Sequence, residues 1–493
     1  MRPGLVASIA RRVGAADGGT SRRQFLQGAL ATSGLMLAGP LAAVAAGPAP
    51  HVIVVGAGFA GLSCAFQLRQ AGARVTLLEA RNRVGGRVLS LDTFIEGRVV
   101  EGGAELIGSN HPTWMAYGEH FGLAFRDVTE LEEETAPIIL NGRRYDGADL
   151  VSLWDRLQQA LERMNADART VNLDAPWKTP DAARLDRTSV ASAFASWSLD
   201  DDARHGALTL LANDNAAWPE RESYLGAIAG VAGGGYERFW VESEVYRCIG
   251  GNQTLAFKLA EAIGQDHIHL GTPVARIRLT ASGVAAEQAD GKTVEGDAVV
   301  LTVPPSAWTH FDIDPGLPAG YQPSTGPTVK YLSRVSRPFW RQSGLQPISL
   351  TDTPVGETWE GTDGQGVTDD QPACLSVFSG GQAAQDCLDF DPASRDEKMK
   401  GYLEAIYPGY AANVEKTMFM GWPKEKWTLC GYSCPAPGEV TIIYPNLDAG
   451  FQDRLFFAGE YTSLLFGGYM EGALHSGAGL ARKLAGKLNL SAR

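Results

Sequence analysis

A glycine pattern near the start of the chain is suited to binding a dinucleotide. Residues 56–61 follow G-x-G-x-x-G, directly after the β-branched run of residues 51–55. Gly56 permits a tight turn, Gly58 lets backbone N–H groups approach a pyrophosphate, and Gly61 allows a helix to pack closely on a strand. A helix that begins at this turn points its N-terminal N–H groups at the phosphates. The pattern therefore predicts a strand, a turn and a helix around a dinucleotide.

An acidic residue and a second glycine pair extend this predicted site. Residues 74–78 read as a strand that leads into Glu79, whose carboxylate can accept hydrogen bonds from the ribose hydroxyls of an adenosine. Gly85 and Gly86 follow, with Arg87 as a fixed cation for the same pyrophosphate. Because a nicotinamide site does not need this extension, the pattern favours a flavin dinucleotide.

The next block, residues 101–105 (Glu-Gly-Gly-Ala-Glu), completes a pattern that resembles the FAD-dependent amine oxidase family. That family includes monoamine oxidases, polyamine oxidases and L-amino acid oxidases. The resemblance covers nearly the whole chain after residue 46 and is strongest in three widely separated blocks. It implies FAD as the cofactor. The residues that it places at FAD are Gly56, Gly58, Gly61, Glu79, Arg81, Gly86, Arg87, Gly103, Ala104, Val274, Gly459, Glu460 and Met470.

The resemblance also assigns residues to the face of the flavin where the substrate reacts. Lys330 matches a lysine that holds a water against flavin N5. Tyr432 and Tyr469 match two aromatic rings between which the substrate amine passes. Glu105 and Trp218 are the further predicted substrate contacts, and the alternative for Trp218 is packing within a helical region.

Two departures from the family pattern bear on the cofactor and the substrate. Members with covalent flavin carry a cysteine immediately before the first of the two tyrosines, where this chain has Gly431, with Cys430 one residue early. FAD is therefore predicted to bind non-covalently. Some L-amino acid oxidases hold the substrate carboxylate with an arginine soon after the glycine pair of the 101–105 block, and this chain has none there. Arg221 and Arg247 are candidates for a replacement.

The predicted activity is that of an FAD-dependent L-amino acid oxidase. A hydride passes from the amine-bearing carbon to flavin N5, the imine hydrolyses to ammonia and a 2-oxo acid, and dioxygen becomes hydrogen peroxide. The choice of an amino acid rests on residues 102–114 and 457–476, which look most like bacterial L-amino acid oxidases. The alternative is a monoamine or polyamine oxidase. A rival from a different class is a desaturase-like or isomerising flavoprotein, or one that passes electrons to another carrier.

The fold class is predicted to be mixed α/β, with two domains built from interleaved segments. A Rossmann-type FAD-binding domain is expected because strand, glycine turn and helix patterns recur in three parts of the chain. A substrate-binding domain with a mixed sheet and a helical part takes the rest. The FAD-binding domain is assigned residues 50–110, 246–313 and 446–490, and the substrate-binding domain residues 111–245 and 314–445, of which 145–245 are helical.

Composition excludes several other classes. The 493 residues include 43 Lys and Arg against 56 Asp and Glu, a net charge of −13, which disfavours a nucleic-acid partner. No apolar run after residue 50 reaches the ~20 residues that span a bilayer, so no stable membrane span is expected. The six cysteines and eight histidines show no metal-ligand spacing. The small-molecule partners are therefore an amino acid or amine and dioxygen, and family members are often homodimers.

The first 46 residues differ from the rest. Arg22 and Arg23 precede a mildly apolar stretch at 28–42 and a run of small residues at 43–46. This order is typical of a twin-arginine export signal, which predicts a periplasmic or secreted protein. The alternative is a flexible basic tail.

Overall fold

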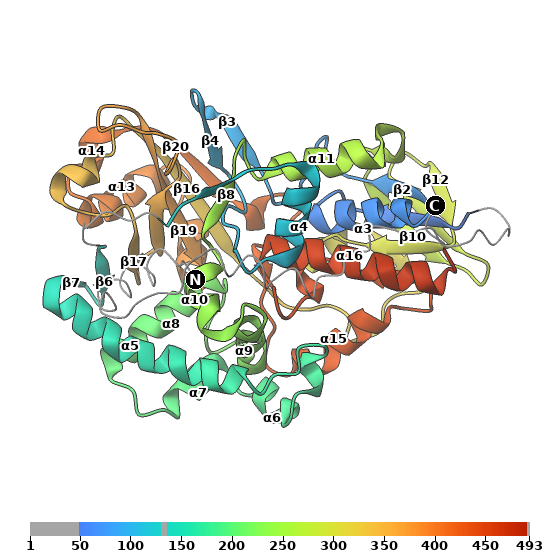
Figure 1. The fold of residues 1–493 in the computed structure, drawn as a ribbon, viewed down its shortest axis with the longest axis horizontal. Coiled ribbons are helices and arrows are strands. Elements are labelled where there is room, and N and C mark those ends of the chain that lie inside the picture. The colour runs from blue at the N-terminus through green and yellow to red at the C-terminus, as the bar shows by residue number, and fades with distance from the viewer. Residues whose placement is uncertain (1–48, 130–135, 491–493) are drawn as a thin grey trace.

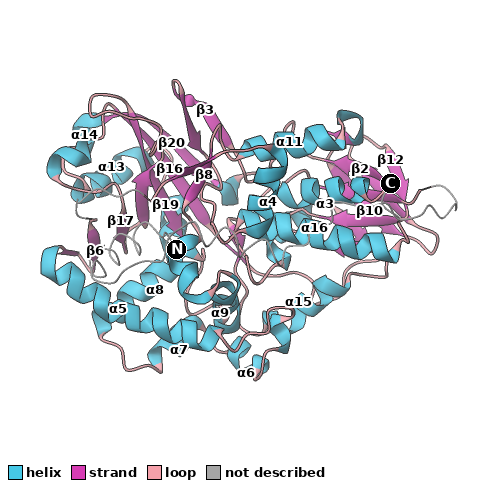
Figure 2. Cartoon of the chain, in the orientation of Figure 1, coloured by secondary structure: helices cyan, strands magenta, loops and turns pink. Residues whose placement is uncertain are grey.

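The structure is a computed structural model that describes residues 49–129 and 136–490. The predicted export signal at residues 1–46 lies outside the described residues. Helices and strands alternate and form two lobes, each built around a sheet (Figures 1 and 2). The mixed α/β class is therefore as predicted.

A parallel sheet of five strands forms the core of one lobe. Its order is β22-β13-β1-β2-β9, and every neighbouring pair is parallel. The strands are short and rich in buried Val, Ile and Leu, as expected for a sheet that is covered on both faces. They are β1 (His51–Val55), β2 (Arg74–Leu78), β9 (Ile268–His269), β13 (Ala298–Leu301) and β22 (Leu455–Phe457). These strands come from all three segments that the sequence assigns to FAD binding, while the domain boundaries themselves stay a prediction.

Helices from distant parts of the chain cover this sheet. They are α3 (Phe59–Gln70), α4 (Pro112–Phe121), α11 (Gln253–Ile263), α15 (Glu439–Ala449) and α16 (Met470–Lys487). Figure 1 shows α16 lying along α3. Their backbones approach so closely that a Cβ added at Gly477 would lie 2.2 Å from the carbonyl oxygen of Ala60. A second sheet of four strands packs at the outer end of this lobe and consists of β10 (Val274–Leu279), β11 (Val284–Gln288), β12 (Thr293–Gly296) and β14 (Asp312–Asp314).

A sheet of seven strands forms the other lobe. Its members, in spatial order, are β20 (Val414–Gly421), β16 (Thr328–Val335), β19 (Ala373–Gly380), β18 (Glu357–Glu360), β17 (Ser349–Thr351), β6 (Ile138–Leu140) and β7 (Arg143–Tyr145). Strand β16, next to the edge strand β20, is antiparallel to both neighbours, and Lys330 lies opposite Phe378 and Met420. Further elements of this half are α12 (Gly381–Asp389), α13 (Arg395–Ile406) and α14 (Tyr410–Asn413).

A helical group lies beside the seven-stranded sheet. It contains α5 (Gly147–Ala168), α6 (Ala182–Arg187), α7 (Val190–Ala195), α8 (Asp201–Asp214), α9 (Tyr224–Gly233) and α10 (Phe239–Glu242). Four strands of three to six residues form two small pairs: β3 (Ser90–Ile95) pairs with β4 (Arg98–Glu101), and β5 (Phe125–Asp127) pairs with β8 (Tyr246–Cys248). A small pair, β15 (Thr325–Gly326) and β21 (Tyr432–Ser433), brings Tyr432 toward the space between the lobes.

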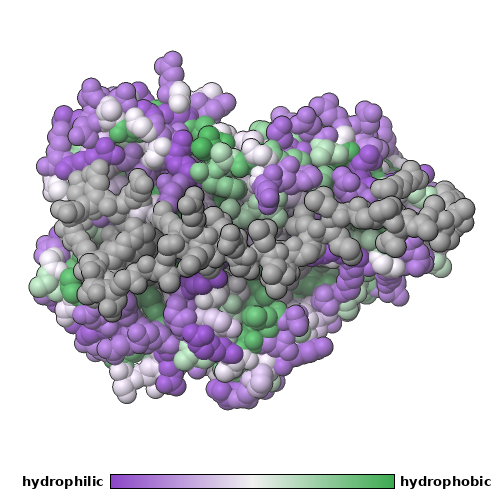
Figure 3. Space-filling model, in the orientation of Figure 1, coloured by the Kyte–Doolittle hydropathy of each residue, from purple (hydrophilic) through white to green (hydrophobic). Residues whose placement is uncertain are grey.

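None of the helices in the described part of the chain is both long and apolar enough to cross a bilayer. Hydrophilic residues cover most of the described surface in the face shown by Figure 3. The six cysteines are all free and buried.

Candidate active site

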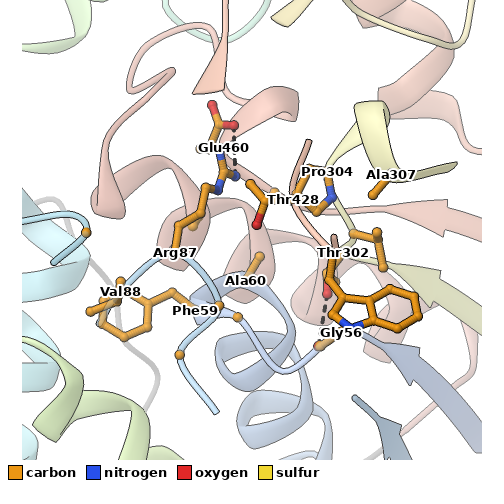
Figure 4. A pocket seen from close by; sticks show the side chains of 18 of the residues that line it. Gly56, Phe59, Ala60, Arg87, Val88, Thr302, Pro304, Ala307, Thr428 and Glu460 are labelled. Carbon is orange, nitrogen blue, oxygen red and sulfur yellow. Dashed lines mark hydrogen bonds and ion pairs between the residues drawn. The ribbon is translucent and has the colours of Figure 1, made fainter. Parts of the chain in front are cut away.

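A large cavity lies at the carboxyl ends of the parallel strands, where open α/β sheets bind their ligands. Its empty space is about 1390 Å³, including solvent at its mouth. Residues at the carboxyl ends of β1, β2, β13 and β22 line it, among them Gly56, Thr302 and Glu460 (Figure 4). Residues of β16 in the other sheet also line it, so both lobes contribute. All of the residues predicted to contact FAD line this cavity except Gly61.

The three glycines of the first motif have different surroundings. Gly56 has a φ of +106°, a conformation that favours glycine. A Cβ at Gly61 would lie 1.9 Å from the carbonyl oxygen of Gly56, so Gly61 permits close packing of α3 on the turn. A Cβ at Gly58 would meet no protein atom within 4 Å, and Gly58 lines the cavity. The space at Gly58 is thus left open for a ligand at the N-terminus of α3.

Glu79 is held rigidly beside this turn. Its Oε2 accepts a hydrogen bond from the N–H of Ala57 at 2.7 Å, and its Oε1 accepts one from the N–H of Arg81 at 2.8 Å. Arg81 is fixed in turn by Glu425 and by Thr428, whose Oγ1 lies 2.7 Å from the guanidinium. An acidic group is therefore fixed at the end of β2, where the predicted ribose would bind.

Arg87 and Glu460 join the first and last segments of the chain. Their ion pair measures 3.0 Å, and the two side chains face one another in Figure 4. Arg87 also donates to the carbonyl oxygen of Gly431 at 2.5 Å. Glu460 accepts hydrogen bonds from the Ser433 hydroxyl at 2.6 Å and from the N–H of Gly468 at 2.9 Å. The pair therefore positions the 431–433 segment and the loop before α16 around the cavity.

These residues fit FAD. Two helix N-termini, at Gly58 for α3 and at Met470 for α16, supply N–H groups toward the cavity, which suits a pyrophosphate and an anionic ring edge. Arg87 adds a cation, Glu79 adds an acceptor, and Gly58 leaves room for close approach. The aromatic side chains Phe311 and Trp427 line the wall of the same cavity and suit a planar ring system.

Lys330 is the buried cation at the junction of the two lobes. Its side chain is 3% exposed. Its Nζ donates to the carbonyl oxygens of Glu101 at 2.7 Å and Gly103 at 3.2 Å, and to Oε2 of Glu105 at 2.5 Å. Because an ammonium has three N–H donors, these acceptors match its full capacity. Lys330 thus holds the 101–105 loop in this structure, and its role in holding a water stays a prediction.

Glu105 is shared between two cations. Besides Lys330, its Oε1 lies 2.8 Å from the Arg247 guanidinium and accepts a hydrogen bond from the Trp359 indole N–H at 2.8 Å. Arg247 also donates to the carbonyl oxygen of Glu360 at 3.0 Å. Arg247 is therefore committed to the protein and does not line either cavity described here. No local sequence signal reveals this network, since its members come from distant parts of the chain.

A second cavity adjoins the first. Its empty space is about 1250 Å³, again including open solvent, and the walls common to both cavities include Lys330, Tyr432 and Tyr469. The hydroxyl of Tyr432 donates to the carbonyl oxygen of Asp214 at the end of α8. The ring of Tyr469 is packed edge-on against His111, with centroids 5.1 Å apart. The two predicted tyrosines are thus brought together where the cavities meet.

The charge of the second cavity is strongly asymmetric. The acidic residues Asp214, Glu222, Glu244 and Glu357 line it together with Glu105. Its described lining contains no arginine or histidine, and Lys330 is its single cation. Burial, followed by the charges of nearby acids such as Asp214 and Glu244, raises the pKa of both cavity tyrosines well above the ordinary value. The cavity therefore favours a cationic ligand.

One of the predicted substrate contacts, Trp218, is placed elsewhere. Trp218 is absent from the described lining of both cavities. Its indole N–H donates to Gln382 at 2.9 Å, and the guanidinium of Arg221 lies 5.5 Å from its ring centre. Arg221 is exposed, so the structure offers neither of the arginines considered for carboxylate binding. Among the described residues there is no group of three or more His, Cys, Asp or Glu placed to hold a metal ion.

Comparison with known sequences relates the chain to flavin enzymes. The profile described as flavin containing amine oxidoreductase matches residues 59–485. The chain is 24% identical over 462 residues to a probable flavin-containing monoamine oxidase A of Dictyostelium discoideum, covering 89% of this chain and 98% of that protein. It is also 24% identical to an L-amino acid dehydrogenase of Synechocystis, covering 91% and 98%.

Solved structures agree on the fold. A putrescine oxidase bound to putrescine has a TM-score of 0.79 and 24% identity, covering 89% of this chain and 99% of that one. The cyclohexylamine oxidase from Brevibacterium oxydans also gives a TM-score of 0.79 at 24% identity, covering 90% and 100%. The likeness shows that this chain shares the fold of these two proteins.

Proposed function

Since the chain belongs to the flavin-containing amine oxidoreductase family and binds FAD, we propose that it oxidises primary amines that carry no carboxylate beside the amine. The observation that carries this proposal is the charge of the second cavity, where acids line the wall and the single described cation is Lys330. Lys330 is paired with Glu105 at 2.5 Å. A substrate carboxylate would have to be buried among like charges without an arginine partner, which is costly.

The residues around the junction of the cavities support a simple division of roles. FAD, when bound, supplies the acceptor for a hydride from the amine-bearing carbon and passes the electrons to dioxygen, which gives hydrogen peroxide. Tyr432 and Tyr469 form the walls that orient the amine. Asp214 and Glu244, the acids whose charges act on both tyrosines, attract the cationic amine, and their carboxylates can accept the proton that the amine loses before it reacts. Lys330 and Glu105 hold the 101–105 loop in place.

An L-amino acid oxidase is the second candidate. It is favoured by the similarity to the L-amino acid dehydrogenase of Synechocystis over 91% of this chain. This activity needs a group that binds the substrate carboxylate, and neither Arg221 nor Arg247 lines the second cavity.

One experiment separates the candidates. Hydrogen peroxide release is measured with the purified protein and L-amino acids, their D-enantiomers and the corresponding decarboxylated amines, alongside anaerobic bleaching of the flavin. Peroxide with amines alone supports the first proposal. Peroxide with L-amino acids alone overturns it in favour of the second. Bleaching without peroxide would identify a dehydrogenase that uses another electron acceptor.

We also propose that FAD is bound without a covalent link. Gly431 lines the first cavity, whereas the buried Cys430 is absent from its described lining. A Cβ at Gly431 would lie 2.5 Å from a methyl carbon of Thr328, so a larger residue does not fit there without movement. Acid precipitation should leave all of the flavin in the supernatant. Flavin in the protein pellet would contradict the proposal.

Export and dimerisation are further proposals that rest on the sequence and the family. Replacement of Arg22 and Arg23 by lysine should abolish export of the full chain if the twin-arginine signal operates, as measured by cell fractionation. Light scattering of the purified protein should give the mass of a homodimer, and the mass of a monomer would refute it.

A further inference from the structure

Glu222 lies in the part of the second cavity that is not shared with the first. It belongs to the loop between α8 and α9 and lines the second cavity only. Its neighbours along this wall include Gly226, Cys434 and Pro435. If the amine of a substrate lies between the two tyrosines, the rest of the substrate chain can therefore extend toward Glu222.

The carboxyl of Glu222 is only partly satisfied. The residue is 3% exposed, and its Oε1 accepts a hydrogen bond from Nδ2 of Asn215 at 2.8 Å. Its Oε2 is buried and has no hydrogen-bond partner among the described residues. Burial raises the pKa of Glu222 to about 8, and the single opposing influence is the Asn215 hydrogen bond. A buried acceptor without a partner is costly, and such groups are uncommon in folded proteins unless a ligand completes them.

An ammonium group is the ligand that this oxygen suits. It would donate a hydrogen bond to Oε2, and its charge would favour the ionised carboxylate that burial otherwise disfavours. The titratable side chains facing this wall are Cys434 and Tyr444, whose pKa values are raised by burial, so neither supplies a cation. Asp214 lines the same cavity and adds negative charge.

We propose that Glu222 binds a second ammonium group of the substrate, so that the preferred substrates are diamines or longer polyamines. This inference rests on the proposed oxidation of amines. The reacting amine lies between Tyr432 and Tyr469, and the remote ammonium reaches Oε2 of Glu222. A monoamine of the same length leaves that oxygen without a partner, and this difference selects the diamine.

The test compares α,ω-diamines with n-alkylamines of matched chain length. Steady-state oxidation and anaerobic flavin reduction are measured for the wild type and for Glu222→Gln, which keeps the acceptor for Asn215 and removes the charge. The wild type should prefer the best diamine over its matched monoamine by about tenfold or more in kcat/KM. Glu222→Gln should lower kcat/KM for diamines by about 10–100-fold, mainly through KM, as for a charge-assisted hydrogen bond. The kcat/KM of Glu222→Gln for monoamines should differ from that of the wild type by less than about twofold.

Controls separate the possible failures. Glu220→Gln removes an exposed acid two positions away and should leave both substrate classes unchanged. Flavin content and thermal unfolding establish that Glu222→Gln is folded. The second variant is Glu222→Asp, which keeps the carboxylate but places it one methylene group farther from the substrate. Equal kcat/KM for diamines and monoamines in the wild type, or an equal loss for both in the variant, would overturn the role of Glu222. If no amine reduces the flavin, the proposed function itself fails.

Discussion

Oε2 of Glu105 lies 2.5 Å from Nζ of Lys330 in an ion pair that is almost fully buried. The other oxygen of the same carboxylate meets Arg247 at 2.8 Å. The carboxylate of Glu105, in the loop after β4, is thus shared by two cations, Lys330 on β16 and Arg247 on β8. Lys330 and Glu105 both line the second cavity at the junction of the lobes, where the reacting amine is expected.

Because both cations depend on Glu105, replacing Glu105 should lower the free energy of unfolding more than replacing Arg247. Glu105→Gln leaves two buried cations without an anion and should lower the free energy of unfolding by about 3–5 kcal/mol. Arg247→Met keeps the pair of Lys330 with Glu105 and should cost less. Urea unfolding of both purified variants, with matched FAD content, measures the difference. An equal loss of unfolding free energy in the two variants, or a larger loss in Arg247→Met, would show that Lys330 and Arg247 do not both depend on Glu105 for their stabilisation.

Lys330 carries the sharpest prediction for turnover. Lys330→Met should slow anaerobic flavin reduction or reoxidation by roughly 100-fold or more while FAD stays bound, because a group at the reacting face is lost. Stopped-flow absorbance follows both half-reactions. Lys292→Met, at an exposed lysine paired with Asp290, is the control and should behave as the wild type. Near-normal rates in Lys330→Met would refute a catalytic role.

The first glycine motif gives a prediction about the cofactor alone. Gly58→Ala should fold normally, since the new Cβ would meet no protein atom within 4 Å, but should retain less FAD because it narrows the cavity. Gly61→Ala should instead destabilise the fold, since its Cβ would lie 1.9 Å from the Gly56 carbonyl oxygen. Flavin absorbance per protein and thermal unfolding of the apoprotein separate the two effects. Equal flavin content in Gly58→Ala and the wild type would argue against close cofactor approach there.

The nucleotide half of the site was predictable because its chemistry is encoded locally. The turn at residues 56–61, the strand leading into Glu79 and the helix after Tyr469 each follow from short patterns, and the structure places β1, β2 and α16 accordingly. Parallel strands must bring their carboxyl ends together, so residues from three distant segments meet in one cavity.

The substrate half was less predictable because long-range contacts define it. Arg247 appeared available in the sequence, but β8 brings it within 2.8 Å of Glu105, which commits its charge. Trp218 follows α8, and its indole N–H donates a hydrogen bond to Gln382, so this residue does not line either cavity. Glu222 belongs to no motif, and its role depends on the burial that α9 and the 434–435 segment impose.

A pH dependence of stability should arise at Glu471, near the start of α16. Its carboxyl accepts hydrogen bonds from the N–H groups of Thr113 at 3.0 Å and Trp114 at 2.9 Å, at the N-terminus of α4. Burial nevertheless raises its pKa from 4.5 to about 7. Between these values the folded protein binds more protons at Glu471 than the unfolded chain does, so its contribution to stability falls as the pH rises.

Glu471→Gln removes this titration. A difference of about 2.5 pKa units corresponds to about 3 kcal/mol. The variant should lose hydrogen bonding at every pH, but its deficit relative to the wild type should shrink by about 3 kcal/mol between about pH 4 and about pH 8. Urea unfolding at both pH values measures this change. Glu101 has a pKa raised in the same direction, but its contribution cancels in the comparison because both proteins contain it. A constant deficit would mean that the pKa of Glu471 is the same in the folded protein as in the unfolded chain, with its two backbone N–H donors and the α4 N-terminus offsetting the cost of burial.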